Sequence, residues 1–121
     1  MSNRTLRVNE LVRRELNDIL RRHYRTEAVV ITITEVRVSP DLREGRVFVA
    51  VAAGEEDAKR SLRWLRSRAV AIRMELGRRI VLKYLPRLTY VLDHSVERGA
   101  RILQVLDGIE RPSASERPVK P

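Results

Sequence analysis

Cysteine is absent from this chain of 121 residues, so neither a disulfide framework nor a thiolate metal site can form. The opening segment MSNRTLRVNE contains no apolar run of the kind found in a secretory signal. No stretch approaches the roughly 18 consecutive apolar residues that a membrane-spanning helix needs. We therefore expect a soluble, cytoplasmic protein that makes no membrane contact. The length allows one domain that buries a core without cross-links.

Catalytic and cofactor signatures are also scarce. The two histidines, His23 and His94, are far apart and show no metal-ligand spacing. Ser39 and Asp41 stand in a turn sequence, where both can bond the backbone locally, and a catalytic triad would still need a histidine. There is no glycine-rich phosphate-binding loop. We therefore expect a protein that is not an enzyme and that uses no metal, no cofactor and no small-molecule substrate.

Aromatic residues make up only 4% of the chain. Base-stacking platforms on a sheet need paired aromatic side chains on one face, whereas Phe48 and Tyr90 stand singly on separate predicted strands. We expect both in the core, and we expect Trp64 to pack against a neighbouring helix. Any nucleic acid would then be bound through its shape and its phosphates, with little reading of bases.

Positive charge is what the sequence has in excess, with a formal net charge of +9. Segment 59–87 holds ten basic residues against Glu75 alone, whereas segment 26–58 is acidic. Clustering of this kind attracts polyanions, and the planar guanidinium of arginine matches phosphate oxygens. A GC-rich genome is a second interpretation of the preference for arginine over lysine, but it does not explain the clustering.

The hydrophobic pattern predicts five regions of secondary structure. Apolar residues at helical spacing indicate a helix over 6–24 and a long helical region from 55 to about 82. Two runs rich in β-branched residues, 28–39 and 46–54, indicate an antiparallel hairpin, and a third strand follows over 87–93. The fold class is therefore α+β, a single small two-layer domain with a three-stranded sheet and helices on one face.

The first predicted strand contains an irregularity. Its apolar phase runs through Val29, Ile31 and Ile33 and then shifts to Val36, so we expect a β-bulge near Thr34–Glu35. In the turn that follows, SPDLREG, we expect the glycine at position 45 to adopt an unusual φ.

The topology and the end of the chain follow from connection lengths and composition. A helical crossover places the third strand parallel to one hairpin strand. We expect the domain to span 1–108, with a short helix within 95–110. The segment 109–121, rich in proline and serine, is expected to be a disordered tail.

Three interpretations compete for the basic segment 59–87: a nucleic-acid surface, a membrane-surface helix, or a solvated face without a partner. A solvated face normally mixes charge signs along a helix, and this segment does not. A membrane-surface helix needs aromatic anchors on an exposed apolar face, and only Trp64 is available. We therefore prefer a nucleic-acid surface made of phosphate contacts.

Four segments, in order, resemble the motifs of the ribosome-binding factor A family. They are RTLRVNELVRRELNDIL, ITITEVRVSPDLREGRVFVAV, AVAIRMELGRRIVLKYLPRLTYVLD and HSVERGARILQVLD, which together cover about residues 4–107. The resemblance implies a bacterial assembly factor for the small ribosomal subunit. It also implies a type II KH-like domain with the order helix-strand-strand-helix-helix-strand.

One departure concerns the interhelical kink, which in the family is an Ala-x-Gly segment. The matching residues here are Ala69, Val70 and Ala71, with alanine in place of glycine. Because alanine is a strong helix former, we expect a shallower kink or one displaced toward Gly77. No GxxG loop occurs in the chain, so phosphate cradling of the usual KH kind is not expected.

The resemblance implies a non-catalytic, monomeric factor that binds the free or immature 30S ribosomal subunit and its 16S rRNA. It implies support for late subunit maturation, rRNA precursor processing and growth in the cold. Two alternatives stay open: a generic KH-like RNA- or DNA-binding module, and a protein–protein adaptor whose basic helix docks an acidic partner. The candidate rRNA-binding residues are Arg7, Arg14, Arg63, Arg66, Arg68, Arg73, Arg78, Arg79 and Lys83.

Overall fold

Three helices and three strands follow one another in residues 3–94, the part of the chain that the computed structural model describes. Their order is helix, strand, strand, helix, helix, strand, as predicted. The helix expected within 95–110 and the tail expected over 109–121 lie outside the described residues. The elements are α1 (Asn3–His23), β1 (Ile31–Val38), β2 (Glu44–Val51), α2 (Glu55–Ser67), α3 (Ala69–Arg79) and β3 (Arg87–Leu92).

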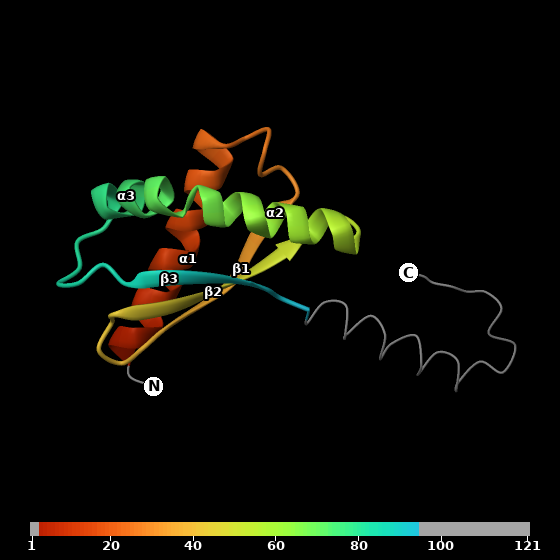
Figure 1. The fold of residues 1–121 in the computed structure, drawn as a ribbon. Helices are drawn as coiled ribbons and strands as arrows, with labels where there is room; N and C mark the ends of the chain where they lie inside the picture. The colour runs from red at the N-terminus through yellow and green to blue at the C-terminus, as the bar shows by residue number, and fades with distance from the viewer. Residues whose placement is uncertain (1–2, 95–121) are drawn as a thin grey trace, which may run out of the picture.

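The sheet has the strand order β1-β2-β3 (Figure 1). β1 and β2 pair antiparallel, which confirms the predicted hairpin, and β3 pairs parallel to β2 after the crossover through α2 and α3. α1 packs on β1, and α2 packs on β2 and β3. In the central strand, Val47 and Val49 are fully buried against this helical layer. The residues that alternate with them lie on the opposite, open face of the sheet.

The predicted bulge is present in β1. Ile33 is paired with Val49, but the next paired residue is Glu35, opposite Phe48, so Thr34 is the extra residue. The bulge lets Ile33 and Val36 both face the core, at 1% and 2% exposure. The Thr34 hydroxyl lies 3.2 Å from the carbonyl of Phe48 and 2.5 Å from the Asp93 carboxylate.

The core is made of apolar residues from all six elements, and two predictions about it are wrong. Val29 is 77% exposed, because it lies in the turn before β1 begins. Phe48 is only partly buried, because it lies between Val47 and Val49 and therefore points to the open face. Tyr90 is buried as predicted, and burial raises the pKa of its hydroxyl to about 12.

The turn between β1 and β2 is held by side chains, as its sequence indicates. The Ser39 hydroxyl donates to Asp41 Oδ1 at 2.6 Å, and the Asp41 carboxylate also accepts from the Arg43 backbone N–H at 3.1 Å. These two hydrogen bonds lower the pKa of Asp41. The unusual φ falls on Leu42, at 61°, and not on Gly45. Gly45 is instead required by packing, since an added Cβ would lie 3.0 Å from Leu88 Cδ2.

Candidate nucleic-acid interface

The basic helical region is broken at Arg68, which has φ −103° and ψ 6° and separates α2 from α3. The Arg68 N–H still donates to the carbonyls of Trp64 and Leu65, at 3.1 and 3.0 Å. The Ser67 hydroxyl also donates to the Trp64 carbonyl, at 2.6 Å, a contact that favours a bend in the helix. The break thus lies one residue before the Ala69–Ala71 segment. No displacement toward Gly77 is found, because that residue lies inside α3.

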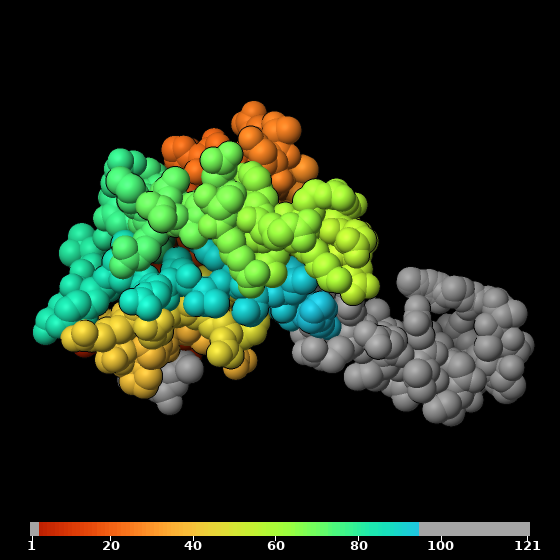
Figure 2. All heavy atoms as spheres, in the orientation of Figure 1, coloured from red at the N-terminus to blue at the C-terminus, as the bar shows by residue number. Residues whose placement is uncertain are grey.

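Arg63 and Arg68 are the most available of the predicted contact residues. Both are exposed, and within residues 3–94 neither has an ion-pair or hydrogen-bond partner for its guanidinium. They belong to α2 and to the break that follows it, which together with α3 form the green part of the surface above β3 in Figure 2. Trp64, between them, packs edge-on against Tyr24 with ring centroids 5.3 Å apart, which confirms its predicted packing role.

Arg66 fastens α2 to β3, the strand at the edge of the sheet, and Arg73 fastens α3 to the segment just before that strand. Arg66 Nη2 donates to the Tyr90 carbonyl at 3.0 Å. Arg73 donates to the carbonyls of Pro86 and Leu85, at 3.1 and 2.6 Å. Both side chains remain exposed, and a guanidinium has five N–H donors, so each keeps donors for a phosphate. These two arginines therefore hold the helices in place and still have N–H donors with which to bind a phosphate.

Arg79 is enclosed by three carboxylates and has only 18% of its side chain exposed. Its Nη1 lies 2.6 Å from Asp18 and 3.2 Å from Glu15, both on α1, and its Nε lies 3.2 Å from Glu75. Hydrogen bonds from Arg79 and then from Arg22 hold the pKa of Asp18 well below its usual value. This network joins α3 to α1.

Glu75 forms ion pairs with two of the predicted contact residues, Arg78 and Arg79. Arg78 Nη1 donates to it at 2.9 Å, and Arg78, followed by Arg79, lowers the pKa of its carboxyl. The charge of Arg78 is therefore balanced within α3, although its side chain is 68% exposed.

The remaining predicted residues lie apart from α2. Arg7 and Arg14 are exposed on α1; the guanidinium of Arg7 has no partner within the described range, whereas the charge of Arg14 acts on the Glu10 carboxylate. Lys83 follows α3, with its Nζ 5.5 Å from the centre of the Tyr84 ring. The nine predicted residues thus do not form one stripe: they include free, balanced and structural cations on more than one side of the domain.

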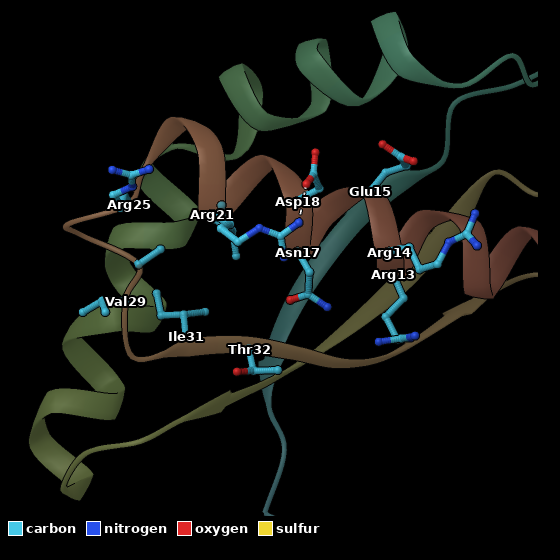
Figure 3. Close-up of a pocket in the computed structure, with 12 residues that line it drawn as sticks. Arg13, Arg14, Glu15, Asn17, Asp18, Arg21, Arg25, Val29, Ile31 and Thr32 are labelled. Carbon is cyan, nitrogen blue, oxygen red and sulfur yellow. Dashed lines mark hydrogen bonds and ion pairs between the residues drawn. The ribbon is translucent and has the colours of Figure 1, made fainter.

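A groove of about 740 Å³ runs between α1 and β1 (Figure 3). Arg13, Arg14, Arg21 and Arg25 lie along it, while Asn17 points from α1 toward β1. The Asn17 amide accepts from the Ile33 N–H at 2.8 Å and donates to the Ile33 carbonyl at 3.0 Å. Asn17 therefore covers backbone groups at the edge of the sheet. The lining of the groove includes Glu15 and Asp18 beside the four arginines.

The open face of the sheet carries a group of cations that the sequence pattern did not lead us to predict. Arg37 and Arg46 are directly opposite each other on β1 and β2, and Arg46 is opposite Thr89 on β3. These arginines lie in segment 26–58, whose net charge is negative, so a charge count for the segment did not reveal them. The period-two alternation of Arg46 and Phe48 with the two buried valines was the signal that could have revealed them.

Within residues 3–94, no helix is long and apolar enough to cross a membrane. The same range contains no group of three or more histidine, aspartate and glutamate side chains placed to hold a metal ion. The features that stand out are the exposed arginines.

The family model for "Ribosome-binding factor A" matches residues 4–106 of the chain. A relative of that name from Opitutus terrae is 64% identical over 111 residues, which cover 92% of this chain and 91% of the relative. Another, from Acetivibrio thermocellus, is 41% identical over 103 residues, 84% of each chain.

Two solved structures share the fold. The crystal structure of ribosome-binding factor A from Thermus thermophilus matches with a TM-score of 0.64 and 24% identity, covering 73% of this chain and 94% of that one. The solution structure of a Thermotoga maritima protein described as a putative ribosome binding factor A matches with a TM-score of 0.69 and 19% identity, covering 80% and 93%. From the family model and these relatives, the chain belongs to the ribosome-binding factor A family.

Proposed function

We propose that this protein is a ribosome-associated factor of the cytoplasm that binds the free or immature 30S subunit as a monomer, through its 16S rRNA. It acts without catalysis, by holding one conformation of the rRNA during late maturation and precursor processing, including at low temperature. The observation that carries the proposal is the pair of exposed, unpartnered arginines at the helix break, Arg63 and Arg68, in a chain of this family.

Phosphate recognition fits the chemistry of these residues. A guanidinium without a carboxylate partner keeps all its donors and its full charge for phosphate oxygens. With about six phosphate contacts, the logarithm of the affinity would fall against the logarithm of salt concentration with a slope of roughly −4 to −6. Arg66 and Arg73 add exposed cations on the same two helices, Lys83 adds one beyond the end of α3, and Arg79 keeps α3 in place on α1.

Co-sedimentation with purified 30S subunits, 50S subunits and 70S ribosomes tests the proposal. We expect selective pelleting with 30S subunits. The double variant Arg63→Gln/Arg68→Gln should bind them roughly twenty-fold more weakly at 0.1 M salt, because two phosphate contacts are lost. Glutamine has a helix propensity close to that of arginine, so both helices are retained.

The matched control is Lys59→Gln/Arg60→Gln in the same helix. It removes the same net charge, but Lys59 lies 3.9 Å from Glu55 and Glu56, and Arg60 lies 2.6 Å from Asp57. These cations are already balanced, so we expect a much smaller loss. Equal binding to all three particles would indicate a generic nucleic-acid module. Binding that survives nuclease treatment of the subunits would indicate an adaptor for an acidic protein.

A further inference from the structure

The open face of the sheet carries an aromatic ring among cations. Phe48 lies on this face at the centre of β2, and Glu35 and Val91 lie opposite it on the two neighbouring strands. The Arg37 guanidinium lies over the ring, 5.4 Å from its centre. Arg46 lies two residues before Phe48 on the same strand, at a distance of roughly 7 Å along it. One nucleotide can span this distance, with its base stacked over the Phe48 ring and its phosphate at Arg46.

Two arginines directly opposite each other are unfavourable for the sheet itself. Like charges at such cross-strand positions destabilise a pair of strands, yet Arg37 and Arg46 occupy one. Glu35 balances Arg37 at 2.6 Å, in an ion pair whose two side chains are 61% and 47% exposed. Arg46 has no partner for its guanidinium within residues 3–94. Its charge is available to a ligand.

A hollow of about 340 Å³ lies between these two arginines on the open face. Thr89 also lines it and places a hydroxyl beside the guanidinium groups, whereas the hydroxyl of Ser39, another lining residue, already donates to Asp41. Glu44 also lines the hollow and is paired in register with Arg87 on β3. Guanidinium and hydroxyl groups around a shallow hollow are the donors that a phosphate diester accepts from.

A second aromatic ring with cations lies where the strand turn meets the start of β3. The Tyr84 ring is 40% exposed, with the Arg43 guanidinium 4.6 Å and Lys83 Nζ 5.5 Å from its centre. The Arg87 N–H donates to the Arg43 carbonyl at 2.8 Å, which holds the turn against β3. Aromatic rings spaced along a positively charged surface are the arrangement by which proteins bind single-stranded nucleic acid.

We propose that the open sheet face binds an unpaired RNA strand, with a base stacked on Phe48 and adjacent phosphates on Arg46 and Arg37. This inference rests on the proposed rRNA binding and adds a second contact surface, opposite the helical layer. The base takes the place of the Arg37 guanidinium over the ring, which costs little because a cation–π contact at an exposed site is weak. Only an unpaired strand fits, since a base within a duplex offers no free face.

Binding of a twelve-nucleotide single-stranded RNA, and of the same RNA in a duplex, tests the inference by fluorescence anisotropy. Phe48→Leu keeps an apolar side chain but removes the aromatic face, and we expect about tenfold weaker binding to the single strand with no change for the duplex. Phe48→Tyr keeps the face and should bind like the wild type. Arg46→Gln should lower the salt slope by about one, whereas Arg60→Gln, a balanced cation, should not.

The outcomes separate this inference from the proposed function. If the wild-type protein binds neither 30S subunits nor RNA, the proposed function and the sheet-face inference are both wrong. If it binds the single strand and Phe48→Leu binds it equally well, with a melting temperature unchanged from the wild type, only the sheet-face contact is wrong. Competition by a polyglutamate peptide as effective as that of the RNA would also overturn it, because the surface would then recognise negative charge without a base.

Discussion

Arg68 precedes α3 and Arg79 is its last residue, and the carboxylates within reach of each determine what it can bind. Arg79 is surrounded by Glu15, Asp18 and Glu75 and holds two helices together. Arg68 has no such partner within the described residues and is fully available to an external anion. Two arginines of one helical region therefore differ in how much of their charge is free, because α1 supplies carboxylates to only one of them.

The carboxylates around Arg79 make stability depend on pH with a defined sign. The pKa of Asp18 is lowered, mainly by Arg79, and the pKa of Glu75 is lowered by Arg78 and then by Arg79. A carboxyl whose pKa is lower in the folded chain contributes stability above its unfolded pKa of roughly 4. That contribution is lost as the pH falls through the folded value.

We predict that Arg79→Gln lowers the melting temperature at pH 7 by about 5 °C. The three carboxylates then repel one another without their shared cation. The difference from the wild type should shrink as the pH is lowered toward 3, because protonation weakens the attraction to Arg79 in the wild type and the repulsion among the carboxylates in the variant. Thermal denaturation followed by circular dichroism across this range is the measurement. Arg63→Gln serves as the control and should melt like the wild type, and a deficit that does not depend on pH would contradict the electrostatic explanation.

At the scale of elements, close packing of the first two strands on the third depends on Gly45. An added Cβ would lie 3.0 Å from Leu88 Cδ2, 3.4 Å from Val38 Cγ1 and 3.6 Å from Pro86 Cβ. The backbone φ at Gly45 is not positive, so the constraint is steric and not conformational.

We predict that Gly45→Ala destabilises the domain by about 1–3 kcal/mol, because Leu88 must move away from its place against the core. Urea denaturation at equilibrium gives this quantity. Gly54→Ala is the comparison, since an added Cβ there meets no atom within 4 Å, and it should cost less than half as much. Equal effects of the two substitutions would contradict the steric account.

The periodicity of apolar residues was enough to predict the elements and their order. The bulge at Thr34 followed from the change of phase between Ile33 and Val36, since both had to reach the core. The helix break lies one residue before the predicted Ala69–Ala71 segment, because the prediction followed glycine and alanine content. The structure instead breaks at Arg68, where Ser67 bonds the Trp64 carbonyl, and such a local hydrogen bond has no signature in composition.

At the scale of the molecule, the excess of positive charge was predicted, but its arrangement was not. The ion pairs of Arg79 with Glu15 and Asp18 join residues far apart in sequence, so a charge count along the chain could not show which arginines they balance. The open sheet face likewise gathers Arg37, Arg46 and Arg87 from all three strands. Only the register of the strands brings them together.

The domain therefore has a helical layer with free cations at the break and an open sheet face with its own cations. The central claim is that the free cations of the break contact phosphates of the small-subunit rRNA. The salt dependence of binding counts such contacts directly, because each contact that is lost reduces the slope by slightly less than one.

The most direct measurement is the 30S affinity of the wild type and of Arg63→Gln/Arg68→Gln across salt concentrations between about 50 and 200 mM. We predict a wild-type slope of roughly −4 to −6 and a slope shallower by about 1.5 to 2 for the variant. Parallel lines for the two proteins, with the variant folded, would contradict the account and place the rRNA contacts elsewhere on the domain.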